Sequence, residues 1–272
     1  MRIRIDFFCF ILRKAFVAMQ IDYYAYHSGI RNWNAGVKVL LAAGTLFFVV
    51  LLDRIAVSLF VVITMGMLTL CVGRTPWRAY LHFMMVPLTF MIFSSAVIAL
   101  QLSAQPIGEW NISVHFFYLC VTERSLSTAV EVLFKAMAGM SALYMMALST
   151  PVNEFILVLQ KMHLPRLLVE LMNLIYRYIF ILFDVAHQMQ TAAKARLGYR
   201  NFRQSCRSFA GIGGNLFLIS LKKAGLYYDA LLARGYDGKL EFLTEELPVK
   251  RKQVIYSILY FILLILIAFV RL

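Results

Sequence analysis

The sequence predicts an all-α membrane protein with about five transmembrane helices and a region of long helices beside the membrane. Three observations support this class. Hydrophobic residues make up 61% of the 272 residues, and five apolar runs are about as long as a membrane-spanning helix. Lys and Arg outnumber Asp and Glu by 27 to 14. Cytoplasmic loops of membrane proteins collect Lys and Arg, so this excess predicts membrane orientation and does not indicate nucleic-acid binding.

The N-terminal segment, residues 1–36, is basic, and we expect it on the cytoplasmic side. Its first apolar stretch, residues 7–12, is too short for a secretory signal, and no small-residue cleavage site follows it. The stretch that begins at Met19 is more typical of the start of a protein than the residues before it. We therefore interpret residues 1–18 as an upstream extension.

Four transmembrane helices are predicted within residues 37–150. They are the apolar runs 37–52, 55–72, 82–102 and 127–148. Asp53 and Arg54 separate the first two runs, which predicts a helical hairpin with a charged tip. Trp77, Arg78 and Tyr80 suit an interfacial return loop before the third helix. Residues 103–121 are expected to form a loop on the opposite side, and Ser149-Thr150-Pro151 ends the fourth helix.

Residues 151–253 are predicted to be a cytoplasmic helical region, and residues 254–272 the last transmembrane helix. The apolar stretch 167–183 is ambiguous because Glu170, Asn173 and Arg177 interrupt it. If that stretch crossed the membrane, the basic residues that follow it would move outside and reverse the charge bias. The prediction is therefore five spans, with the N-terminus inside.

Three helices are predicted in this cytoplasmic region. The first opens at Asn153 as N-cap and covers residues 154–163. The second runs from Arg166 to about Arg196, with Gly198 as its stop. The third opens near Asn215, after the glycine-rich residues 211–214, and ends at Arg234 with Gly235 as the residue after the cap.

The second and third helices end in similar sequences, Ala195-Arg196-Leu197-Gly198 and Ala233-Arg234-Gly235. In each, a small residue gives room for another backbone, and the Arg projects past the helix end where it can pair with a carboxylate. The plainer interpretation is an ordinary helix end, because Arg in a last turn complements the helix dipole. Two such ends in one basic region favour a docking role.

Several segments, in order and spacing, make the chain from Met19 onward resemble a known transporter subunit. They are Ile21-Asp22-Tyr23-Tyr24-Ala25-Tyr26, Thr150-Pro151, Leu164-Pro165-Arg166, Tyr176-Arg177-Tyr178-Ile179-Phe180 and Ala233-Arg234-Gly235-Tyr236-Asp237-Gly238. The chain resembles the transmembrane T subunit of energy-coupling factor (ECF) transporters, in the CbiQ-like branch associated with cobalt and nickel uptake.

This resemblance implies a non-catalytic subunit that links two ABC-type ATPase subunits to a membrane subunit that binds the metal. It implies that Ala195, Arg196 and Gly198, with Ala233, Arg234 and Gly235, form the ATPase-coupling ends. One departure stands out, since the first end reads Ala-Arg-Leu-Gly and its Gly comes one place late. The implied location is the inner membrane of a bacterial or archaeal cell, in a process that supplies cobalamin biosynthesis.

The sequence shows no motif for catalysis, ATP binding or metal binding by this chain. It has no P-loop motif, so ATP and Mg²⁺ are expected on the partner ATPase subunits. The five histidines and four cysteines are scattered, which predicts no metal site, and no cofactor is expected on this chain.

Glu131 and Lys135 lie four residues apart in the fourth span, so they are positioned to neutralise one another. Such a pair inside a membrane also suits an ion path. The self-paired interpretation is the plainer one. Ala138 and Ala142, one turn further on, predict close helix packing.

Two alternatives remain open at this point. One is a shared T subunit that serves vitamin-binding partners, which neighbouring genes would reveal. The other is a self-contained membrane transporter or enzyme, which needs clustered polar groups at mid-membrane depth, and only Glu131 and Lys135 suggest one.

Overall fold

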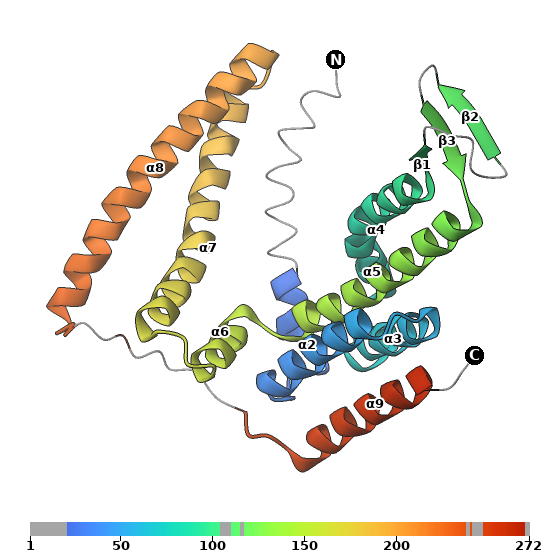
Figure 1. Ribbon diagram of the computed structural model, residues 1–272. Helices are drawn as coiled ribbons and strands as arrows, with labels where there is room; N and C mark the ends of the chain where they lie inside the picture. Colours follow the sequence, from blue (N-terminus) through green and yellow to red (C-terminus); the bar gives the residue numbers. More distant parts are fainter. Residues whose placement is uncertain (1–20, 104–109, 115–116, 238–239, 241–246, 270–272) are drawn as a thin grey trace. The chain divides into compact units, whose positions relative to one another are not determined.

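The structure of the protein is a computed structural model that describes residues 21–103, 110–114, 117–237, 240 and 247–269. The segment interpreted as an upstream extension lies outside these residues. The chain divides into two compact units. We call residues 21–151 with 246–272 the membrane unit, and residues 152–245 the hairpin unit (Figure 1).

The five predicted apolar helices are all present in the membrane unit. They are α2 (Ala35–Leu51), α3 (Ile55–Met67) with the π-helix η1 (Leu68–Val72), α4 (Trp77–Ala99), α5 (Glu123–Ser149) and α9 (Arg251–Phe269). Among the described residues, four helices are long and apolar enough to cross a membrane: α3 with η1, α4, α5 and α9. The apolar helix α2 has 17 residues. It rises about 25 Å, at the lower end of spanning lengths.

Two helices begin earlier than predicted. The α4 helix starts at Trp77, so Trp77, Arg78 and Tyr80 lie in its first turns and not in an interfacial loop. Tyr80 is buried, and its ring lies 6.5 Å from that of Tyr144 on α5. The α5 helix starts at Glu123, where the Ser125 hydroxyl accepts a hydrogen bond from the Thr122 N–H at 3.1 Å and stabilises the first turn.

A small antiparallel sheet occupies part of the predicted loop between α4 and α5. Its strands are β1 (Gln101–Ser103), β2 (Trp110–Val114) and β3 (Phe117–Val121), in the order β1-β3-β2. The last two strands are rich in aromatic and β-branched residues, which favour extended backbone. These short strands leave the protein an all-α membrane protein in class.

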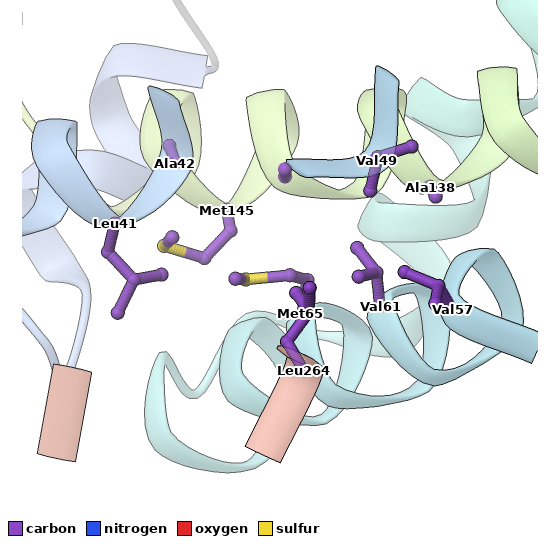
Figure 2. Close-up of a cluster of buried hydrophobic side chains, with 10 residues drawn as sticks. Leu41, Ala42, Val49, Val57, Val61, Met65, Ala138, Met145 and Leu264 are labelled. Carbon is purple, nitrogen blue, oxygen red and sulfur yellow. The ribbon is translucent and has the colours of Figure 1, made fainter. Parts of the chain in front are cut away.

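The core of the membrane unit lies around α5, which contacts α2, α3 and α4. Figure 2 shows side chains from α2, α3, α5 and α9 converging there. Ala138 and Ala142 are fully buried, which confirms the predicted close packing at these two small residues. Hydrogen bonds from the hydroxyls of Ser95 to Ala129 O (2.8 Å) and Tyr144 to Phe83 O (2.9 Å) join α4 to α5.

A buried lysine joins α2 to the end of α5. Lys38 is 2% exposed, and its Nζ donates a hydrogen bond to the carbonyl oxygen of Ser149 at 2.8 Å. Ser149 is the last residue of α5, so its carbonyl has no partner within the helix. The ammonium group satisfies that carbonyl and complements the negative end of the helix dipole.

Asn34 and Gln253 join the start of α2 to the start of α9. Asn34 is the N-cap of α2, and its side-chain oxygen accepts from the Gly36 N–H at 2.8 Å. Its side-chain nitrogen donates to the Leu247 carbonyl. Gln253 accepts from the Asn34 N–H at 3.4 Å, so these two amides connect segments far apart in sequence.

The hairpin unit contains α6 (Val152–Lys161), α7 (Arg166–Ala195) and α8 (Phe202–Ala233). The α7 boundaries match the prediction. Asn153 lies inside α6, so it is not the N-cap that was predicted. The start of α8 was also predicted wrongly, because the glycine-rich residues 211–214 lie within the helix. Each Gly costs about 1 kcal/mol there, and the helix formers on both sides outweigh that cost.

We expect Lys38→Met to lower the free energy of unfolding by about 1–3 kcal/mol, because the Ser149 carbonyl stays buried without its donor. Thermal unfolding of the purified protein in mild detergent measures the change. The control is Lys222→Met, at an exposed position on α8, which should leave the transition temperature nearly unchanged. Equal transition temperatures for the two variants would contradict a stabilising role for Lys38.

Candidate functional site

The two predicted coupling ends have the same backbone structure. At the end of α7, the N–H of Gly198 donates to Ala193 O at 2.8 Å, and that of Leu197 to Lys194 O at 3.1 Å. At the end of α8, the N–H of Tyr236 donates to Leu231 O at 3.1 Å, and that of Gly235 to Leu232 O at 3.0 Å. This pair of hydrogen bonds defines a Schellman motif, which turns the chain sharply away from the helix.

Each arginine occupies the C-cap position of its helix. The backbone angles agree closely, with φ −89° and ψ 16° at Arg196 and φ −96° and ψ 10° at Arg234. Both arginines are exposed, as are Ala195 and Ala233 before them. Across the described part of the chain, neither guanidinium makes an ion pair. Both are therefore free to pair with an external carboxylate.

The late glycine of the first end does not change its geometry. The residue after each C-cap must adopt the left-handed conformation, and it is Leu197 (φ 58°) in one end and Gly235 (φ 79°) in the other. Gly198 is needed for a different reason. A Cβ on Gly198 would lie 2.5 Å from the Ser208 hydroxyl oxygen and 2.9 Å from Ala193 O. The Ala193 carbonyl in the last turn of α7, together with the Ser208 hydroxyl, therefore leaves no room for a side chain at this position.

The hairpin places the two arginines at opposite ends of α8. The α7 helix ends at the turn that leads into α8, whereas Arg234 follows the last residue of α8 (Figure 1). The 32 residues of α8 rise about 48 Å along the helix axis. The two guanidinium groups are thus separated by roughly the length of that helix.

A tyrosine pair holds α7 against α8 between these ends. The rings of Tyr178 and Tyr227 lie 5.5 Å apart in an edge-to-face arrangement. Partial burial raises the pKa of Tyr178 above its usual value, and the neighbouring Tyr227 raises it further. The Tyr178 ring therefore remains neutral at physiological pH.

The intrahelical pair Glu131–Lys135 predicted from the sequence is not present. The Lys135 ammonium group instead forms an ion pair with the Asp53 carboxylate at the tip of the α2–α3 hairpin. Glu131 is exposed, one helical turn away. Sequence spacing alone could not identify Asp53, because 82 residues separate it from Lys135. A tertiary contact between the hairpin tip and α5 determines the pairing.

Metal-binding groups are dispersed across the part of the chain that the structure describes. No three His, Cys, Asp or Glu side chains there are close enough to hold a metal ion. Glu170, one of the charges that interrupts the ambiguous stretch, is buried and accepts a hydrogen bond from Arg166 Nε at 3.1 Å. Its partner lies one turn before it on α7, so this pair stabilises the start of that helix.

Comparison with known proteins gives matches over most of the chain. A family model described as cobalt transport protein, CbiQ, matches residues 27–245. The chain is 27% identical to the cobalt transport protein CbiQ of Rhodobacter capsulatus, over 82% of this chain and 87% of that protein. It is 30% identical to a putative fused cobalt transport protein, CbiMQ, of Methanocorpusculum labreanum, over 83% of this chain and 38% of that longer protein. An uncharacterized protein of Methanocaldococcus jannaschii is 26% identical, over 92% of each chain.

The Schellman motif at Arg234 predicts opposite effects for two glycine substitutions. Gly235→Ala should destabilise the end of α8 by about 1 kcal/mol, because alanine resists positive φ. Gly225→Ala, inside the helix, should stabilise it by about 0.5–1 kcal/mol. An added Cβ meets no atom within 4 Å at either position, so sterics do not differ. Hydrogen exchange of the amides in the last two turns of α8 measures both effects. If the two variants changed the exchange rate in the same direction, the Schellman motif would be contradicted.

For the ion pair, we expect Asp53→Asn and Lys135→Met each to lower the transition temperature in detergent more than the double variant does. Each single change leaves one charge without its partner, and because the Asp53 side chain is 77% exposed and that of Lys135 29%, each loss should be at most about 1 kcal/mol. Glu131→Gln is the control and should have little effect, since Lys135 pairs with Asp53 and not with the exposed Glu131. Additive losses in the double variant would show that the two groups do not interact.

Proposed function

The chain belongs to the CbiQ family of cobalt transport proteins, and from that premise we propose that it is the non-catalytic coupling subunit of an ATP-driven, ECF-type importer. As a member of this family it is a multi-pass membrane component of cobalt transport. The finer role is to transmit motion from ATPase subunits to a membrane subunit that captures Co²⁺ or Ni²⁺.

The observation that carries this proposal is the matched pair of helix ends. Arg196 and Arg234 lie in the same cap position of two identical motifs, both exposed. A guanidinium held this way forms a bidentate pair with a carboxylate, and such a charge-assisted contact contributes about 1.5–3 kcal/mol. Two similar contacts suit two copies of one ATPase, one bound at the end of α7 and the other at the end of α8.

Rigid helices make this arrangement suitable for transmitting force. The α7 and α8 helices have 30 and 32 residues. Contacts between them occur at the tyrosine pair and where Ser208 donates to Gly198 O at 2.8 Å. When ATP draws two ATPase subunits together, the two held ends move, and the helices carry the displacement toward the membrane. We place the hairpin unit in the cytoplasm for this reason and because of its basic charge.

The membrane partner is inferred from the fused relative. Its printed name joins two cobalt transport components, and this chain matches only 38% of its length. We infer that a separate membrane protein, equivalent to the unmatched part, captures the metal ion for this chain. Metal binding and ATP hydrolysis then both belong to partners, so this subunit is not an enzyme.

We expect Arg234→Ala and Arg196→Ala each to reduce ATP-driven Co²⁺ uptake at least tenfold, with the double variant inactive. Uptake of radioactive cobalt into proteoliposomes that contain the co-purified complex measures this. The matched control is Arg124→Ala, an exposed arginine at the start of α5, predicted on the other side of the membrane. Uptake at the unmodified rate in the double variant would reject the coupling role.

A further inference from the structure

Leu197 combines an unfavourable backbone conformation with an exposed apolar side chain. Its φ is 58°, and 66% of its surface is exposed. Among the described residues, Arg74 and His163 are the other non-glycine residues with positive φ. Both of those side chains are polar and suit contact with water, whereas Leu197 gains nothing from exposure.

The helix end itself does not need a side chain at this position. Gly235 occupies the same place in the second motif, with open space around it, and glycine adopts positive φ without strain. The same hydrogen bonds form in both motifs. A leucine at positive φ therefore makes the end of α7 less stable than a glycine would.

The surroundings of the two ends also differ in charge and polarity. The α7–α8 turn carries exposed Arg196, Arg200 and Arg203, together with Phe202, which is 64% exposed. Near the end of α8, an exposed aspartate, Asp237, follows Arg234 by three residues. The turn therefore presents a more strongly basic surface than the end of α8, where Leu232, 49% exposed, precedes Arg234 and Asp237 follows it.

We propose that Leu197 is an apolar anchor that enters a pocket on the ATPase partner, beside the carboxylate that pairs with Arg196. The proposal rests on the coupling function above and adds to it that the two ends bind unequally. The α7–α8 turn binds through Arg196 and Leu197 together, whereas the end of α8 binds through Arg234 with a glycine at the position of Leu197. The complementary surface is an apolar pocket bordered by acidic groups.

A formed protein pocket explains these features better than a lipid surface does. A bilayer is fluid, so any exposed apolar residue on a basic helix face would bind it, without a strained turn. The left-handed conformation instead directs one side chain from one fixed point, adjacent to the arginine. Strained residues of this kind are concentrated at binding sites, where binding compensates the strain.

The test compares variants at residue 197 in the full-length chain, with the P-loop ATPase that co-purifies with it as the probe. Leu197→Gly should increase hydrogen-exchange protection of the last turn of α7, because the strain is relieved, yet weaken ATPase binding about tenfold, because an apolar contact is lost. Leu197→Ala should weaken binding to a similar extent, and Leu197→Met should retain it. The control is Leu226→Ala, at a position within α8 that is 69% exposed, which should bind normally.

The outcomes separate this inference from the function on which it rests. If no ATPase co-purifies with the unmodified chain, the coupling function fails. If the ATPase binds Leu197→Gly as tightly as the unmodified chain, the anchor is rejected and the coupling function stands. A third outcome uses Leu197→Cys, labelled with a polarity-sensitive dye after the four natural cysteines are replaced by serine. An apolar signal in proteoliposomes without the ATPase would mean that residue 197 contacts lipid, and would overturn the proposal.

Discussion

A residue in the left-handed conformation ends each of the two long helices, and the exposure of both arginines depends on it. The reversed chain hydrogen-bonds to the last helical carbonyls, so the C-cap side chain is left pointing away from the protein. Without the turn, α7 and α8 would continue and Arg196 and Arg234 would be ordinary positions on a helix surface. Leu197 and Gly235 both meet this backbone requirement, but only Leu197 presents a side chain there, and the surfaces of the two ends differ for that reason.

In the membrane unit, a lysine side chain makes a polar contact at each end of the α2–α5 helix pair. Lys38 on α2 donates to the final carbonyl of α5, and Lys135 on α5 pairs with Asp53 beyond the end of α2. These contacts set how far α2 and α5 overlap. The core of small and branched residues between them then packs closely around Ala138 and Ala142. A well-packed unit of this kind resists deformation, which suits the coupling role proposed for the chain.

Several elements were predictable because local sequence specifies them. The boundaries of α7 follow from Pro165 before it and the turn residues after it. The end of α8 at Arg234, followed by Gly235, was predicted for the same reason. The start of α8 was not, because four residues rich in glycine, 211–214, indicated a break. Nothing packs closely around those glycines, so helix formers on both sides carried the helix through.

The sequence by itself determined the class of the protein, the apolar helices and the two arginine-bearing helix ends, because a hydrophobic run and a capping residue are both read from one continuous stretch of chain. Only the tertiary structure decided which side chains meet. It paired Lys135 with Asp53, buried Lys38 against the end of α5, and brought the Ser208 hydroxyl to the space where a side chain on Gly198 would lie. These contacts join residues from different helices, and spacing along the chain carries no information about how those helices pack.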